Sequence, residues 1–368
     1  MSAQRDERRR FLQQAILTGT ACFGAACAGP AWDGVARSAW RESRTGQASL
    51  PAGLTSGGLV AAEPPAPHLR TLPSLGFSLY GMKTWAWADA LRELAEIGYR
   101  CVELPVMADW PWDSRRWNAA ERRAFQQGLE RHGLRLSALM ENLSLLPTVP
   151  ANSSPEDVRR LGREQRRVNQ ERLAAAADLA RAWSPQTSTP DSPSPIIETI
   201  LGGKPADWAQ DRQRMVDELG AWAEVVGRQQ VVLAIKPHVS GALHRPEDAA
   251  WLIEQVQSRW IRATFDYSHY QLRRWKFADC WQTLGPVTSF IHVKDATGDA
   301  GKFQFLLPGA GSIDYREYFR AVITSGYRGD VVVEVSGQLH GRPDYDARRA
   351  ARESFAPLQK ALAAVAQS

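Results

Sequence analysis

The fold is decided by the stretch IRATFDYSH, residues 261–269, a largely apolar run that stops abruptly at Asp266. Three further segments have the same form: VVLAIKPH (231–238), SFIHVKD (289–295) and VVVEVSG (331–337). Apolar β-branched runs of this kind are typical of parallel strands that are buried on both faces. The polar residues that end them are then expected to project from one face of a barrel, where such folds keep their active sites.

The rest of the chain alternates strand-like and helix-like stretches. Earlier strand-like runs lie at residues 75–80, 101–104, 136–140 and 195–201. Amphipathic helical patterns lie at residues 87–97, 119–132, 155–182, 207–226, 245–256, 277–284, 314–325 and 347–364. Eight strands alternating with eight helices predict an α/β protein with the (β/α)8 TIM barrel fold, a parallel eight-stranded barrel with outer helices. A doubly wound dinucleotide-binding sheet is disfavoured, because no G-x-G-x-x-G follows an early strand.

Length and composition describe an ordinary globular chain. Its 368 residues suffice for one large domain of roughly 250–300 residues with extensions. The hydrophobic share of 44% and the charged share of 23% are those of a soluble protein. The formal net charge is +5, of which residues 1–28 contribute +2. So small and evenly spread an excess predicts that the protein binds no nucleic acid.

Residues 1–28 have the form of a twin-arginine export signal. The sequence Arg8-Arg9-Arg10-Phe11-Leu12 places two arginines, one intervening residue and then Phe-Leu. An apolar stretch too short to span a bilayer comfortably follows, and Ala-Cys-Ala at 26–28 matches an A-x-A cleavage site. The alternatives are a basic amphipathic helix, or a lipid anchor at Cys27. We therefore expect an exported protein, periplasmic or otherwise extracytoplasmic, with no transmembrane segment after the signal is removed.

The remaining chain divides into a linker and one domain. Residues 29–70 are rich in Gly, Ala, Pro and Ser without a sustained period, which predicts a disordered linker. The barrel domain is then expected over residues 71–368. A homodimer is a further expectation, since barrels of this kind often dimerise.

Residue types that bind metals end three of the strands: Asp266, His292 and Glu334. Two carboxylates and an imidazole can hold a divalent cation such as Mn²⁺, Co²⁺, Mg²⁺ or Zn²⁺. A carboxylate beside such a metal can also move a proton next to a carbonyl that the metal polarises. A lone histidine at a strand end is ordinarily structural, but the coincidence at three successive strand ends favours metal binding or catalysis.

Other polar and aromatic residues are secondary candidates. Asp295 and Lys294, together with His269, are expected in a second shell that orients the ligands. Carboxylates that end or follow earlier strands also lie within reach of the site, with a solvated loop carboxylate as the ordinary alternative for each; they are Glu103, Glu141 and Glu198. Trp85 and Trp110 offer aromatic faces that can stack on a substrate ring, or that simply pack at the barrel rim.

These residues resemble the xylose isomerase-like TIM barrel family, the sugar phosphate isomerases and epimerases. The resemblance runs from about residue 75 to residue 364. Its most specific parts are FDYSH, IHVKD, LPGAGSIDY (307–315) and GYRG (326–329) leading to VVVEVSG. It implies a sugar as the small-molecule substrate and a divalent metal as the cofactor.

In that family the fifth, sixth and eighth strands end in Glu, Asp and Glu, and a histidine near the seventh completes the metal site. The two glutamates exchange protons at the carbon beside the sugar carbonyl. The resemblance therefore implies Asp266, His292 and Glu334 as metal ligands, with Glu334 also a catalytic acid/base. It implies His238 and His269 as substrate contacts.

Lys236 departs from the family pattern. It stands where the family places its first glutamate, and the Pro237-His238 that follows argues against a misalignment. A unit-charge pair at about 4 Å is worth on the order of 4 kcal/mol at an effective dielectric of 20, so an ammonium beside a metal costs affinity. Three outcomes follow: a neutral Lys236 acting as a base, a Lys236 turned aside to pair with Glu198 or Glu141, or an ammonium that replaces the metal.

The leading functional hypothesis is an exported isomerase or epimerase that transfers a proton beside the carbonyl of a sugar or keto-sugar, with metal assistance. Glu334 is its expected acid/base and Lys236 its second catalytic group. A free sugar or an oxidised glycoside is favoured, because phosphorylated sugars are scarce outside the cytoplasm. One alternative is a keto-sugar lyase, dehydratase or hydrolase on the same barrel. Another, favoured by Lys236, is a carbohydrate-binding protein without catalysis.

Overall fold

The protein is described by a computed structural model that covers residues 72–145, 152–183 and 194–367. The predicted export signal and linker, residues 1–70, lie outside the described residues. None of the helices within the described ranges is long and apolar enough to cross a membrane.

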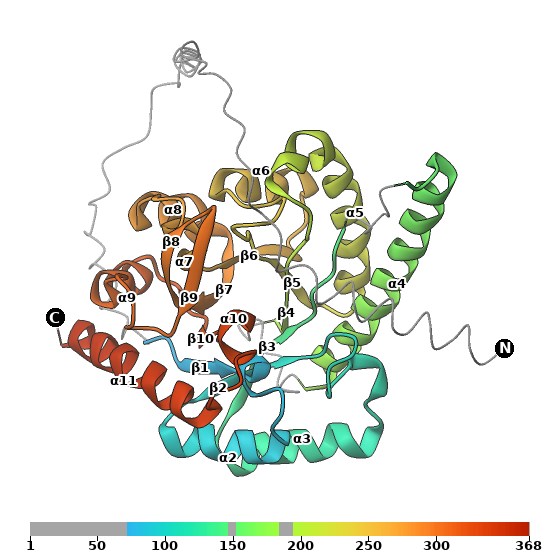
Figure 1. Ribbon diagram of the computed structural model, residues 1–368. Coiled ribbons are helices and arrows are strands. Elements are labelled where there is room, and N and C mark those ends of the chain that lie inside the picture. Colours follow the sequence, from blue (N-terminus) through green and yellow to red (C-terminus); the bar gives the residue numbers. More distant parts are fainter. Residues whose placement is uncertain (1–71, 146–151, 184–193, 368) are drawn as a thin grey trace, which may run out of the picture. The chain divides into compact units, whose positions relative to one another are not determined.

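Eight parallel strands close into a barrel in the order β1-β10-β7-β6-β5-β4-β3-β2 (Figure 1). They are β1 (Leu75–Ser78), β2 (Cys101–Pro105), β3 (Arg135–Met140), β4 (Ile196–Thr199), β5 (Val232–Ile235), β6 (Ile261–Phe265), β7 (Thr288–Val293) and β10 (Val331–Val333). The barrel closes where β1 pairs with β10, with Leu75 opposite Val331 and Phe77 opposite Val333. The predicted (β/α)8 barrel is confirmed.

The outer helices lie close to the predicted ranges and surround the strands in Figure 1. They are α2 (Trp87–Ile97), α3 (Ala119–Arg131), α4 (Pro155–Ala182), α5 (Trp208–Arg228), α6 (Pro246–Val256), α8 (Phe277–Leu284), α9 (Tyr315–Thr324) and α11 (Ala347–Ala366). Helix α3 begins with a capping box between Asn118 and Glu121, and α2 ends at Gly98, whose φ of 117° suits glycine.

Short elements also lie between these helices and strands in the described part of the chain. Two of those are α-helical, α7 (Tyr267–Gln271) and α10 (Gly337–His340). Four are 3₁₀ turns: η2 (Leu79–Met82), η3 (Ser114–Arg116), η4 (Pro205–Asp207) and η5 (Gly285–Val287). Helix α10 directly follows the end of the eighth barrel strand, and α7 follows the sixth, so both lie beside the polar strand ends.

An antiparallel hairpin that the sequence reading did not predict follows β7. It consists of β8 (Asp295–Asp299) and β9 (Lys302–Leu306). Strand β8 requires glycine at Gly298, where φ is 96° and a Cβ atom would lie 2.2 Å from the Lys302 backbone oxygen. Phe305 packs with Val239 and Leu272, so the hairpin is anchored to the polar end of the barrel.

The barrel interior is filled by an apolar plug. It is made of Cys101, Ala138, Ala234, Phe290 and Val332, with Ile196 packed against it. These side chains come from β2, β3, β5, β7, β10 and β4, so nearly every strand contributes to the plug. Gly76 on β1 contributes no side chain, because a Cβ atom there would lie 2.6 Å from the Cys101 sulfur. The interior is therefore a packed core and not a pore.

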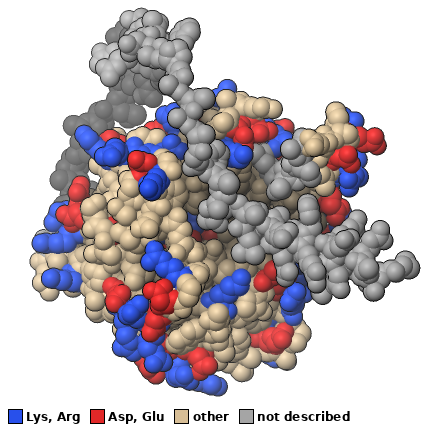
Figure 2. Space-filling model, viewed as in Figure 1, with Lys and Arg blue, Asp and Glu red and all other residues tan. Residues whose placement is uncertain are grey.

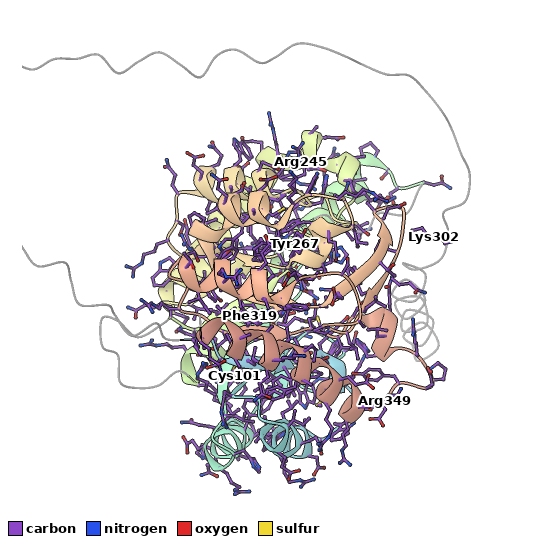
Figure 3. The ribbon with its side chains drawn as sticks, turned by 90° about the vertical axis from the view of Figure 1, so that its left-hand side faces the viewer. Cys101, Arg245, Tyr267, Lys302, Phe319 and Arg349 are labelled. Atoms are coloured by element: carbon purple, nitrogen blue, oxygen red, sulfur yellow. The ribbon has the colours of Figure 1, made fainter. Side chains whose placement is uncertain are left out.

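Charged side chains lie mainly on the outside of the domain. Figure 2 shows Lys and Arg interspersed with Asp and Glu over the face in view. In Figure 3, Cys101 and Phe319 lie within the domain, whereas Arg245, Lys302 and Arg349 lie at its edge. The buried charges described below are exceptions to this arrangement.

Phe290→Ala tests the plug, because Phe290 is its largest side chain and is fully buried. We expect a loss of about 3–5 kcal/mol in the free energy of unfolding, from lost contacts and the cavity left behind. Urea denaturation followed by circular dichroism measures it. Leu72→Ala, at a residue 41% exposed, is the control and should change stability by less than about 0.5 kcal/mol. A loss below about 1 kcal/mol for Phe290→Ala would contradict a tightly packed plug.

Candidate active site at the carboxyl ends of the strands

The alternation of side chains along the strands assembles the site. Residues two apart on a strand point to the same side. The relevant plug residues are Cys101, Ile196, Ala234, Phe290 and Val332. Two positions beyond each of them, the same strand or its end carries a charged or ionisable group. These groups are Glu103, Glu198, Lys236, His292 and Glu334, each 9% exposed or less. The site is thus one layer above the apolar plug, at the carboxyl end of the barrel.

Lys236 lies at the centre of this layer. Its Nζ atom is 2.9 Å from Glu198 Oε1, 3.1 Å from His292 Nδ1 and 3.3 Å from Glu334 Oε2. Burial alone lowers the pKa of Lys236, but the nearby carboxylates, Glu198 and Glu334 foremost, outweigh it and hold that pKa above its ordinary value. Lys236 is therefore an ammonium that pairs with Glu198 and also reaches the predicted metal ligands, which argues against the neutral-base hypothesis.

Lys294 provides a second buried ammonium. Its Nζ atom contacts Asp266 Oδ2 and lies 2.5 Å from Glu334 Oε2. The ring of Phe305, from the hairpin, lies 4.9 Å from the same nitrogen. Lys294, which was predicted to orient the ligands, contacts two of the three predicted ligands, Asp266 and Glu334.

Glu334 is consequently an ionised carboxylate. Burial raises the pKa of Glu334, but Lys236, Lys294 and His292 outweigh burial and hold that pKa well below the ordinary value. Glu198 differs, because burial holds its pKa above the ordinary value despite Lys236. Glu198 and Glu334 thus lie against the same lysine, but the pKa of Glu198 is raised and that of Glu334 is lowered.

His292 bridges the two sides of the barrel. Its Nε2 atom is 3.1 Å from both carboxylate oxygens of Glu103, and its Nδ1 atom is 3.6 Å from Glu334 Oε2. Burial lowers the pKa of His292, but the charge of Glu103 opposes burial and the resulting pKa is raised. In the neutral ring, Nε2–H donates to Glu103 and Nδ1 accepts from the Lys236 ammonium.

The predicted metal ligands are brought together. Asp266, His292 and Glu334 each offer one ligand atom, and these atoms all lie within 4.8 Å of one another. The donor set is one that a divalent cation accepts. Each of the three residues nevertheless contacts an ammonium: Asp266 meets Lys294, His292 meets Lys236, and Glu334 meets both lysines. The carboxylates and imidazole fit a metal, whereas the two lysines in these positions do not.

The two predicted substrate histidines lie side by side next to Asp266. Their ring centroids are 4.3 Å apart, and His269 Nε2 is 3.4 Å from Asp266 Oδ2. Burial lowers the pKa of His269 to about 4 and holds that of His238 well below its ordinary value. His238 Nδ1 accepts a hydrogen bond from the Ser240 backbone, so the neutral ring carries its proton on Nε2.

The remaining predicted residues have other partners. Glu141 is buried against Arg172 of α4, and burial raises the pKa of Glu141 to about 7. Asp295 accepts hydrogen bonds from the backbone of Gly309 and Ile313 at 2.7 and 3.2 Å, and so orders the loop that contains the GAG sequence. The described contacts of Asp295 are to this loop and not to the ligand trio.

The two predicted tryptophans lie in different surroundings. Trp85 packs against the main core with Arg348 of α11 over its ring at 5.7 Å. Trp110 stacks on Tyr80, with ring centroids 4.9 Å apart, and Tyr80 also meets His340 edge-on at 4.6 Å. Burial and the charge of Glu334 raise the pKa of Tyr80 to about 12, so this phenol keeps its proton near the acidic groups.

Tyr80 and His340 were not singled out in the sequence. A usable signal existed for Tyr80, because it follows Gly76 and Ser78 at the two-residue spacing that points into the barrel. His340 had no such signal, since it depends on how α10 folds back over η2.

Comparison with known proteins agrees with this geometry. The family profile described as "Xylose isomerase-like TIM barrel" matches residues 91–361. A fructoselysine 3-epimerase from Escherichia coli O157:H7 is 21% identical over 268 residues, which are 71% of this chain and 90% of the epimerase. An inosose dehydratase from Bacillus licheniformis is 23% identical over 154 residues, 38% of this chain and 51% of that protein, so the chain matches about half of its length.

Solved structures share the fold. The apo form of the 3-keto-D-glucoside 4-epimerase YcjR from E. coli superposes with a TM-score of 0.57 at 16% identity, covering 78% of this chain and 99% of the epimerase. At this identity the likeness concerns the fold alone. The profile match spans most of the described barrel, and the chain belongs to the xylose isomerase-like TIM barrel family.

Proposed function

We propose that the protein is an enzyme that transfers a proton beside the carbonyl of a sugar or keto-sugar, as an isomerase or epimerase. The observation that carries this proposal is the pair Glu334 and Glu198, two buried glutamates on either side of Lys236 whose pKa values are shifted in opposite directions. Divergent shifts of this kind separate a base from an acid at one pH. Membership of a family that contains sugar epimerases supports the choice of substrate class.

Glu334 is the base in this mechanism. Its carboxylate is ionised and is 9% exposed. It removes the proton from the carbon beside the carbonyl, and the negative charge that develops passes to the carbonyl oxygen. Glu198, with its raised pKa, is the group that holds a proton and returns it. Neutral His238, which carries its proton on Nε2, is the proposed donor to a sugar hydroxyl, whereas the two nitrogens of His269 face Val239 and Asp266.

Metal assistance is a separate part of the sequence hypothesis. Asp266, His292 and Glu334 are the residues that would hold the ion, and a bound divalent cation would polarise the substrate carbonyl. The two ammonium groups on those residues argue against such an ion. In the proton transfers assigned above, the proton moves to and from carboxyl groups of this chain.

A lyase or dehydratase is the second candidate, favoured by the match to an inosose dehydratase. Removal of the same proton by Glu334, followed by loss of a substituent from the next carbon, converts one reaction into the other. Product mass separates them, because an epimer has the mass of the substrate and an elimination product does not.

Glu334→Gln tests the base. We expect the rate of deuterium incorporation from D₂O beside the carbonyl to fall by about 10²–10⁴-fold, because the amide cannot accept the proton. NMR on a panel of keto-sugars and oxidised glycosides measures it, with Glu224→Gln, an exposed residue of α5, as the charge-matched control. Unchanged exchange in Glu334→Gln would refute the assignment. No exchange with any sugar in the wild type would instead support the non-catalytic carbohydrate-binding alternative.

The pH dependence of kcat/KM tests Glu198 as the proton-donating acid. Because the pKa of Glu198 is raised and that of Glu334 is lowered, the active form has Glu198 protonated and Glu334 ionised. We expect kcat/KM to fall as the pH rises through the pKa of Glu198. Glu198→Gln should have low activity without this alkaline fall. The same alkaline fall in Glu198→Gln would show that another group titrates.

We also propose export through the twin-arginine route, from the residues Arg8-Arg9-Arg10-Phe11-Leu12. Replacing Arg8 and Arg9 by Lys should leave the precursor in the cytoplasm, because that pathway reads the arginine pair. Cell fractionation and the mass of the mature chain measure it, with Arg5→Lys as the control. Normal export of the double variant would contradict the proposal.

A further inference from the structure

The ligand atoms of the predicted metal site are covered by two cations of the chain itself. Lys294 Nζ contacts Asp266 Oδ2 and Glu334 Oε2, and Lys236 Nζ contacts Glu334 Oε2 and His292 Nδ1. Glu334 Oε2 is therefore shared by both ammonium groups. All three residues of the predicted ligand trio therefore contact an ammonium.

Together the two lysines carry the same charge as the divalent cation that the sequence pattern predicts. Asp266 and Glu334 carry two negative charges, and the two ammonium groups carry two positive charges, as one divalent cation would. A third cation added among them would meet repulsion from both lysines at contact distance. Buried ions require such pairing, and here the chain supplies it.

Both lysines are held by regular structure. Lys236 directly follows β5, and its backbone N–H donates to the Thr199 carbonyl at the end of β4 at 2.8 Å. Lys294 lies two residues after His292 and so points to the same side of the strand. Each lysine is 3% exposed, and Phe305 covers the Lys294 nitrogen. Neither ammonium can leave the site without uncovering buried carboxylates.

We propose that Lys236 and Lys294 together replace the divalent cation in this barrel, and that Lys294 binds the substrate oxygen on which negative charge develops. An ammonium has three N–H donors. Asp266 and Glu334 accept from two of the Lys294 donors, which leaves one for the substrate. Lys236 is instead enclosed by Glu198, His292 and Glu334, at 2.9, 3.1 and 3.3 Å from its nitrogen. The second half of the proposal rests on the proposed function, and the first half does not.

The cation replacement is tested by metal binding, with Mn²⁺ alone as the probe. We expect the purified wild-type chain to bind no stoichiometric Mn²⁺ by electron paramagnetic resonance titration. The double variant Lys236→Glu/Lys294→Met restores a carboxylate and removes both ammonium groups. Its Kd for Mn²⁺ should be at least about 100-fold lower than that of the wild type, because the local charge falls by three units.

The matched control is Lys276→Glu/Lys360→Met, the same exchange at two exposed lysines that do not belong to the buried cluster. It should bind Mn²⁺ as the wild type does. If the first double variant fails to fold by circular dichroism, the single variant Lys236→Glu takes its place, with the same direction of change. One Mn²⁺ per wild-type chain, or no gain in a folded variant, would overturn the replacement. This readout needs no substrate, so it is independent of the proposed function.

The role of Lys294 is tested by Lys294→Gln in the deuterium-exchange assay. We expect kcat to fall by about 10²–10³-fold with little change in KM, because the lost contact stabilises charge that forms only in the transition state. Exchange that depends on Glu334 but is unaffected by Lys294→Gln would refute this role and leave the proposed function intact. If Glu334→Gln exchanged deuterium as fast as the wild type, the proposed function would be wrong, whatever the result of the Mn²⁺ titration.

Discussion

The shared contact of Lys236 and Lys294 with one oxygen of Glu334 is the interaction on which the rest of the site depends. Glu103, Glu198 and Asp266 are enclosed in the same layer, where an unpaired ion costs several kcal/mol. The two lysines and His292 connect all of these carboxylates into one network. Removing Lys236 would take away the ammonium that pairs with Glu198, and removing Lys294 would take one ammonium from both Asp266 and Glu334, so the residues that tune the chemistry also hold the strand ends together.

The apolar plug makes that network possible. Phe290 and Val332 occupy the interior just below His292 and Glu334, and the ring of Phe290 lies 4.9 Å from that of His292. A close-packed floor excludes water and prevents the charged side chains from collapsing into the barrel. The hairpin covers the opposite side, where Phe305 meets both Lys294 and His269. The charges are therefore held between two apolar surfaces, which strengthens every electrostatic contact among them.

Much of this arrangement could be predicted from residue patterns. The apolar runs that end at Asp266, His292 and Glu334 predicted both the barrel and the convergence of the trio, because parallel strands deliver their carboxyl ends to one face. The hairpin was not predicted, although KFQFL alternates polar and apolar residues, because its partner strand DATGD is mostly polar and has no strand-like pattern. Asp295 was expected near the ligands, whereas its oxygens accept from the backbone at Gly309 and Ile313.

The sequence by itself determined the period of the strands, the residue type at each strand end and the departure at Lys236 from the family pattern. Only the tertiary structure decided which ions meet. Lys236 Nζ lies against Glu198, His292 and Glu334 because β4, β5, β7 and β10 converge on one axis. These contacts join residues 38, 56 and 98 positions apart, so no local pattern records them. The pairing follows from barrel closure, which brings distant strand ends within hydrogen-bonding distance.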